Sequence, residues 1–151
     1  AGEKEKYLYF VVEGVQRAFY LSDDDKEATI VFTYPASFSG VADSFLTQTP
    51  SNYFMETVTA SRFLRISYEE IQQLMKTYPA IQEMILTLTA FILKGVLMRQ
   101  AELQCFTNEQ KFRALVKRSP HLINLVPHKY IASYLGMDAT NFSKLLGSIK
   151  I

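Results

Sequence analysis

The fold is decided by a stretch near the C-terminus, PHKYIASYLGMDATNFSKLL, which occupies residues 127–146. Ile131 and Leu135 stand four residues apart and therefore lie on one face of a helix. Gly136 follows at a point where the backbone can adopt a positive φ and turn sharply. Phe142 then stands where a second helix would pack back onto the first. This spacing predicts two short helices joined by a tight turn, the arrangement called a helix-turn-helix.

The second helix of this pair, expected over residues 139–150, presents small polar side chains and one lysine on its outward face. Such side chains can reach base edges or phosphates when a helix lies in the major groove of DNA. The residues expected to face DNA, on this helix and at the start of the first one, are His128, Lys129, Thr140, Asn141, Ser143 and Lys144. Double-stranded DNA is therefore the predicted partner of this segment.

The distribution of charge supports an anionic partner, although the net charge of the chain is only +1. Residues 1–98 contain 8 Lys and Arg against 12 Asp and Glu, which gives −4, whereas residues 99–151 contain 8 against 3, which gives +5. A basic segment attached to an acidic one indicates two separate tasks. Four further basic residues of the second segment fit either phosphate contacts or a solvated helix face: Lys111, Arg113, Lys117 and Arg118.

The first third of the chain has the pattern of short strands separated by turns, rich in β-branched and aromatic residues. Strands are predicted over residues 7–12, 15–21, 28–34, 54–60 and 63–66. Such a series indicates a sandwich or a barrel. The period changes at Ser67, where Ser67 and Glu70 form a capping box that opens a helix over 68–77. A second box, at Thr107 and Gln110, opens a helix over 108–118.

A long helix is predicted between these two regions, from Pro79 to about Cys105, because apolar residues there recur at alternating intervals of three and four. At 1.5 Å per residue, about 26 residues span about 39 Å, more than one small barrel needs. Two interpretations stay open: a core helix and, as the favoured one, a dimer helix that packs against its twin. The predicted contact stripe consists of Ile81, Ile85, Leu88, Ile92 and Gly95. Glu83 and Lys94 interrupt the apolar run, which argues against a membrane span.

The counts of cysteine and histidine exclude several kinds of site. Cys105 is the only cysteine, so neither an intramolecular disulfide nor a multi-cysteine metal site can form. The two histidines, His121 and His128, have no carboxylate or cysteine at ligand spacing, and no metal site is predicted. A metal-dependent enzyme on a barrel of this kind would need histidines in its strands. The chain is therefore not expected to be an enzyme, and no catalytic residue is assigned.

The order of the elements, strands, then a long helix, then a helix-turn-helix, resembles the cyclic AMP receptor protein/FNR (CRP/FNR) family of bacterial transcription regulators. The opening Gly2-Glu3-Lys4…Leu8-Tyr9-Phe10-Val11-Val12-Glu13-Gly14 is similar to a segment of that family's jelly-roll barrel. Tyr130-Ile131-Ala132-Ser133-Tyr134-Leu135-Gly136 resembles the helix-turn-helix of the branch common in Bacteroidetes. The resemblance implies an α+β fold. Its parts are a cyclic-nucleotide-binding-like jelly-roll β-barrel with a short helix over residues 1–78, a dimerisation helix over 79–106 and a helix-turn-helix domain over 107–151. Family members begin earlier, so the chain is expected to be N-terminally truncated.

The resemblance also implies where a cyclic nucleotide would bind, and the sequence departs from the family there. Members that bind cyclic AMP place a Glu against the ribose hydroxyl and an Arg followed by Ser against the cyclic phosphate. Val41 stands at the Glu position, and Ser51 and Asn52 stand at the Arg and Ser positions. A buried phosphate needs a cation, and these side chains carry none. The degenerate pocket, with the long-helix positions that would contact the base, comprises Gly40, Val41, Ser51, Asn52, Leu97 and Met98.

The sequence therefore predicts a homodimeric transcription regulator in the cytoplasm that does not bind cyclic AMP and carries no cofactor. Its expected partners are double-stranded DNA, a second copy of the chain, RNA polymerase and a small-molecule effector of unknown identity, with no membrane. The alternative is a ligand-binding sensor module that has lost specific DNA binding. The second helix of the pair supports this alternative, because it lacks the Arg and Glu with which the family reads bases, and Lys144 alone stands at the second Arg position.

Overall fold

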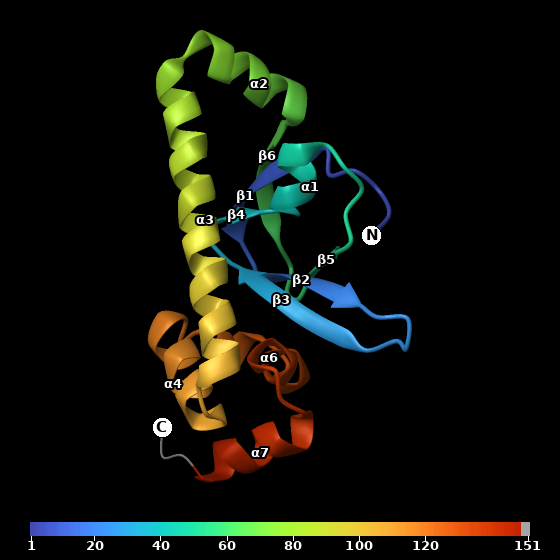
Figure 1. Ribbon diagram of the computed structural model, residues 1–151, viewed down its shortest axis with the longest axis vertical. Coiled ribbons are helices and arrows are strands. Elements are labelled where there is room, and N and C mark those ends of the chain that lie inside the picture. Colours follow the sequence, from blue (N-terminus) through green and yellow to red (C-terminus); the bar gives the residue numbers. More distant parts are fainter. Residues whose placement is uncertain (149–151) are drawn as a thin grey trace.

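The computed structural model describes residues 1–148 of the chain. A long helix, α3 (Pro79–Cys105), runs along one side of the molecule from top to bottom in Figure 1. Two small sheets lie beside its middle part, and the C-terminal helices gather around its lower end. The molecule thus has the predicted order of strands, long helix and helical C-terminal region.

Six strands form two antiparallel sheets, with the orders β4-β1-β6 and β3-β2-β5. Their bounds are β1 Tyr7–Glu13, β2 Gln16–Leu21, β3 Glu27–Thr33, β4 Phe38–Ser39, β5 Phe54–Thr57 and β6 Arg62–Ser67. We call the two sheets, with the short helix α1 (Ala42–Thr47), the barrel. Strand β5 ends earlier than predicted, because Val58 and Thr59 turn to donate backbone hydrogen bonds to the Val15 carbonyl at 2.8 and 3.2 Å. Strand β4 was not predicted, since two residues show no alternation.

Two helices begin where their capping signals predict. Ser67 Oγ accepts a hydrogen bond from the Glu70 backbone N–H at 3.2 Å, while Glu70 Oε2 accepts one from the Ser67 N–H at 2.8 Å. Thr107 and Gln110 form the same capping box. The remaining bounds are α2 Tyr68–Thr77, α4 Asn108–Arg118, α5 Leu122–Leu125, α6 His128–Leu135 and α7 Ala139–Ser148. The predicted end of the last helix at residue 150 lies outside the described residues, and the single turn of α5 has no periodicity that could have predicted it.

The barrel and the C-terminal helices share one apolar core. Val15 and Phe32 of the barrel belong to the same cluster of buried side chains as Leu115, Ile131 and Phe142 of the C-terminal helices. Burial of apolar surface is the main favourable term in folding. The shared core therefore holds the C-terminal helices against the barrel instead of leaving them on a tether.

Part of the predicted contact stripe of α3 faces the barrel of the same chain. Ile85, Leu88 and Ile92 face the barrel of their own chain, where they line an apolar cavity of about 420 Å³. Ile81 is half-buried in the first turn of the helix. An added Cβ at Gly95 would meet nothing within 4 Å, so this glycine makes no close contact with the described residues. The physical reason is that the barrel needs apolar cover along α3, and this face of the helix supplies it.

Another face of α3 carries large apolar side chains that stay exposed. Leu86, Leu93 and Leu97 are 70%, 57% and 59% exposed, and Ala90 continues the same line. These four residues, which we call the α3 seam, recur at intervals of four, three and four, the spacing of a coiled-coil contact. Length and composition alone would also let α3 cross a membrane. The barrel packed against its other face, however, would keep lipid from surrounding the helix.

Candidate functional site

The turn between α6 and α7 has the geometry that the sequence predicts. Gly136 is left-handed, with φ of 68°, and its backbone N–H donates to the Ser133 carbonyl at 3.0 Å. The Met137 N–H donates to the Ala132 carbonyl, also at 3.0 Å. These two bonds satisfy carbonyls that the end of α6 would otherwise leave without partners. Gly136 thus supplies the sharp turn that sets α7 at an angle to α6.

Buried apolar residues hold α6 and α7 together as one unit. Ile131, Leu135 and Phe142 are fully buried, as the spacing predicts. The Phe142 ring packs edge-on against Phe112 of α4, with ring centroids 5.8 Å apart. Asp138 caps α7 through Oδ1, which accepts a hydrogen bond from the Asn141 N–H at 2.8 Å. Helix α7 therefore cannot turn independently of α6.

The residues predicted to face DNA all lie on the surface of this unit. The exposed residues are His128, Lys129, Thr140, Asn141, Ser143 and Lys144. Two of them already have local hydrogen bonds: the Asn141 side-chain amide donates to the Asp138 carboxylate, and Ser143 Oγ donates to the Ala139 carbonyl at 2.9 Å. The outward face of α7 is thus accessible, polar and partly engaged with its own helix.

Three of the four remaining basic residues have structural contacts. Lys111 is buried on α4, Arg113 pairs with Glu109 at 2.7 Å, and Arg118 pairs with Glu102 of α3. Lys117 is exposed. The sequence offered two roles for these four residues, phosphate contacts or a solvated helix face. Arg118 has a third role, because it joins α4 to the long helix.

Glu102 is the buried carboxylate at the lower end of α3, with only 3% of its surface exposed. Its Oε2 lies 3.1 Å from Arg99 Nη1 and 3.0 Å from Arg118 Nη2. Burial alone would raise the pKa of Glu102, but the hydrogen bonds and charges of Arg118 and Arg99 outweigh it, so the pKa is lowered. Glu102 is therefore ionised at neutral pH and ties α4 to α3.

The phosphate-binding region implied by the resemblance, residues 40–52, is closed by its own hydrogen bonds. Ser51 Oγ donates to the Tyr53 carbonyl at 2.9 Å and accepts from the Tyr53 N–H at 2.8 Å. Ser44 Oγ accepts from the Glu5 N–H at 2.9 Å and donates to the Thr49 carbonyl at 2.6 Å. Each hydroxyl thus already uses its one proton inside the fold. Neither can donate a hydrogen bond to a bound phosphate without losing one of these contacts.

The six residues of the predicted pocket differ in their exposure. Val41 and Ser51 are buried, whereas Asn52, Leu97 and Met98 are exposed. None of the six lines the 420 Å³ cavity, which lies between the barrel, α2 and α3. The lining of that cavity includes no lysine or arginine. The cavity therefore lacks the cation that a phosphate requires.

A comparison with protein-family models identifies the family to which the barrel segment belongs. The model of the cyclic nucleotide-binding domain matches residues 1–78, slightly more than half of the chain. The chain belongs to the cyclic nucleotide-binding domain family. No curated protein sequence is similar enough to the chain to count as a relative.

Solved structures show the same fold over nearly the whole chain, at low sequence identity. FixK2 from Bradyrhizobium japonicum is 18% identical, with a TM-score of 0.83 over 97% of this chain and 76% of that one. The c-di-GMP responsive global regulator CLP from Xanthomonas campestris is 20% identical, with a TM-score of 0.70 over 97% and 78%. The catabolite activator protein of Thermus thermophilus is 19% identical, with a TM-score of 0.57 over 97% and 70%. The CRP/FNR fold expected from the sequence is thereby confirmed.

Helix α6 has a second contact face that the sequence did not predict. Tyr130, Ser133 and Tyr134, which no prediction assigned, contact the barrel and α3. The available signal was a pair of aromatic residues four apart, Tyr130 and Tyr134, on a different face from Ile131 and Leu135. A helix that is apolar or aromatic on two faces is packed on both.

Proposed function

We propose that this protein is a homodimeric, DNA-binding transcription regulator whose helix α7 enters the major groove. The observation that carries the proposal is the outward face of α7, polar and exposed on a helix that buried residues hold rigidly. A recognition helix needs this combination, because its base contacts depend on a fixed orientation. The side chains that would contact the duplex are Thr140, Ser143 and Lys144. His128 and Lys129 would lie at the edge of this contact surface.

The charge of the molecule fits this assignment. Residues 99–151, which include the helices that would contact phosphates, carry a net charge of +5, and residues 1–98 carry −4. DNA binding gains much of its affinity from release of counterions by such basic segments. Lys144 and Lys129 are exposed, and Lys144 belongs to the proposed base-reading face itself.

The α3 seam supports a second copy of the chain as partner. Leu86, Ala90, Leu93 and Leu97 form a line of apolar residues that the barrel leaves uncovered. Two such seams packed together would remove this surface from water, at about 25 cal/mol per Å². Dimerisation would also set two α7 helices on one duplex, as a two-fold operator requires. RNA polymerase and a small-molecule effector stay predictions.

A salt titration of DNA binding tests the function. Fluorescence anisotropy of a labelled random duplex of about 30 base pairs, enough for two half-sites, measures affinity across salt concentrations. We expect affinity to fall steeply with salt, and Lys144→Ala to weaken binding about threefold to tenfold and reduce the salt slope by about 1. Lys26→Ala is the matched control, because it removes an equal charge from the exposed turn between β2 and β3. Affinity without salt dependence would contradict the proposal.

The alternative function, a sensor module without specific DNA binding, is favoured by one observation. Asn141 and Ser143 are hydrogen-bonded within their own helix cap and turn, and α7 has no arginine over Ala139–Ser148. The same titration separates the two functions. The sensor alternative predicts equal affinity for the wild type, Lys144→Ala and Lys26→Ala.

A further inference from the structure

Helix α6 has two contact faces, and only one of them belongs to the helix-turn-helix core. Ile131 and Leu135 point into that core. Tyr130, Ser133 and Tyr134 stand at positions i, i+3 and i+4 and therefore share another face. This face meets strand β3 of the barrel and the long helix α3. The helix that positions α7 is thus itself held by the barrel.

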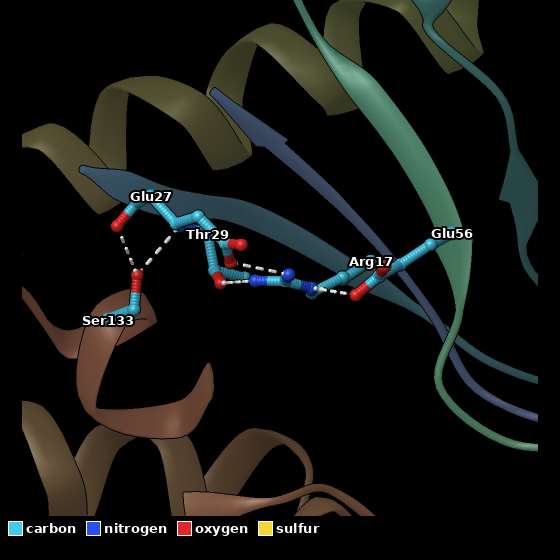
Figure 2. A network of polar contacts seen from close by, with 5 residues as sticks. All are labelled: Arg17, Glu27, Thr29, Glu56 and Ser133. Carbon is cyan, nitrogen blue, oxygen red and sulfur yellow. Dashed lines mark hydrogen bonds and ion pairs between the residues drawn. The ribbon is translucent and has the colours of Figure 1, made fainter. Parts of the chain in front are cut away.

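Ser133 takes the place of a neighbouring strand at the edge of β3. Strand β3 is an outer strand of its sheet, so some of its backbone groups lack a strand partner. The Thr29 N–H donates to Ser133 Oγ at 2.9 Å, and Ser133 Oγ donates to the Glu27 carbonyl at 3.1 Å (Figure 2). In a parallel ladder one residue of a partner strand would make both bonds, because it pairs with the N–H of one residue and with the carbonyl two residues before it. A hydroxyl can replace it because it accepts and donates at once.

Arg17 of β2 stiffens this edge from inside the sheet. Its side chain is 1% exposed, and its guanidinium lies 2.6 Å from both Glu27 and Glu56 and 3.1 Å from Thr29 Oγ1 (Figure 2). The guanidinium carbon also lies 3.6 Å from the centre of the Tyr130 ring on α6. A buried arginine is tolerated when its donors are paired, and stacking on an aromatic ring adds attraction. Arg17 thus contacts β3, β5 and α6 at the same point.

Tyr134 makes a third contact, which attaches α6 to the long helix α3. The Tyr134 ring lies 5.3 Å from the Phe32 ring of β3 and 4.0 Å from the guanidinium carbon of Arg99 on α3. Arg99 also donates a hydrogen bond to the Tyr134 carbonyl. Helix α6 is therefore held between the barrel and α3.

We propose that the β2–β3 hairpin is a positioning element for DNA recognition, acting through Arg17 and Ser133. Because α6 and α7 move as one unit, fixing α6 against β3 fixes α7. This inference rests on the dimer of the proposed function. In that dimer, the contact between α6 and β3 also fixes the distance between the two α7 helices. Ser133 and Arg17 touch no DNA in this arrangement; they are positioning residues. The protein should therefore prefer one spacing between two half-sites, and this preference should depend on a hydroxyl far from the recognition face.

The test is selection of binding sites from a random duplex library, compared between the wild type and Ser133→Ala. Selection needs no knowledge of the operator and reports the spacing between enriched half-sites directly. We expect the wild type to enrich paired half-sites at one spacing. Ser133→Ala should reduce the preference for that spacing over neighbouring ones about threefold to tenfold, the effect of losing a net hydrogen bond at each α6. The half-site sequence itself should stay unchanged, because α7 is unaltered.

Two further variants make the result specific. Ser22→Ala is the matched control: it removes a serine hydroxyl from the turn of the same hairpin, where it accepts from the Lys26 N–H at 3.1 Å and contacts no residue of α6. Tyr130→Leu keeps apolar bulk and removes the stacking on Arg17, so it should relax the spacing as Ser133→Ala does. Hydrogen exchange at the Thr29 amide shows that the contact is broken, since Ser133→Ala removes its acceptor.

Each outcome decides a different claim. Relaxed spacing in Ser133→Ala and Tyr130→Leu, with wild-type spacing in Ser22→Ala, supports the positioning role. Unchanged or narrower spacing in Ser133→Ala, with faster exchange at Thr29, overturns it and leaves the proposed function standing. A wild type that enriches no paired half-sites overturns the proposed function itself.

Discussion

The region around α1 and the outward face of α7 both carry short polar side chains, and they use them in opposite ways. In the barrel, Ser44 and Ser51 are buried and each hydroxyl donates and accepts a hydrogen bond inside the fold. On α7, Thr140 and Lys144 stand in solvent. A polar side chain that is buried and fully paired stabilises the fold, whereas one that is exposed is available to a partner. The buried hydroxyls around α1 thus serve the fold, whereas the side chains on the outward face of α7 are accessible.

Glu102 departs from this contrast and provides the largest predicted effect. Glu102 is a buried charge that belongs to the C-terminal region, where it ties α3 to Arg118 of α4. Glu102→Gln leaves Arg99 and Arg118 without a counter-charge and should lower the free energy of unfolding by about 3 kcal/mol. Chemical denaturation measures it. Glu109→Gln is the control: its pair with Arg113 is exposed, so its loss should cost at most about 0.5 kcal/mol.

The pH dependence of stability gives a second measurement on the same residue. The pKa of Glu102 is lowered in the folded state through Arg118 and Arg99, which outweigh burial. Its contribution is therefore fully present above the unfolded value of about 4.3 and is lost as pH falls through the lower folded pKa. Glu102→Gln should remove that part of the acid dependence. A loss of stability below 1 kcal/mol, with an unchanged acid profile, would show that the charge is not needed at this junction.

The second prediction compares one serine from each region. Ser44→Ala leaves the Glu5 N–H and the Thr49 carbonyl without their partner, and it should lower the free energy of unfolding by about 2 kcal/mol. Ser143→Ala removes only an exposed hydroxyl on α7 and should change stability by less than about 0.5 kcal/mol. DNA affinity, measured by anisotropy, should respond in the reverse order. Equal effects of the two variants on stability would break the contrast between the regions.

Local signals in the sequence predicted most elements of the fold. The two capping boxes, the positive φ at Gly136 and the inward positions of Ile131 and Leu135 follow from interactions within a few residues, and all of them are confirmed. The sequence did not predict that Ile85 and Leu88 line a cavity beside the barrel, because α3 is apolar on more than one face. Periodicity alone cannot tell which face meets the barrel and which stays exposed.

The contact between the barrel and α6 was missed for a different reason. Ser133 lies 104 residues from Thr29 in the chain, and its hydroxyl pairs with backbone groups, which carry no sequence signal. Arg17 alternates with apolar residues in its strand and could equally have been a surface residue. Its burial depends on Glu27 and Glu56 arriving from two other strands. Such pairings are decided by tertiary structure.

The smallest predicted effect is the response to cyclic AMP, for which we expect no change in thermal unfolding. A ligand that binds only the folded state at 100 times its Kd would stabilise it by about 2.7 kcal/mol, so even weak binding is measurable. Adenosine monophosphate at the same concentration is the control for unspecific effects.

A shift with the cyclic nucleotide alone would mean that a cation reaches the region around Ser51. Lys4 is the candidate, because it pairs with Pro50 in an isolated bridge beside Ser51. Lys4→Ala should then abolish the shift, and a shift that survives this change would require residues 40–52 to open and rebuild their hydrogen bonds around the phosphate.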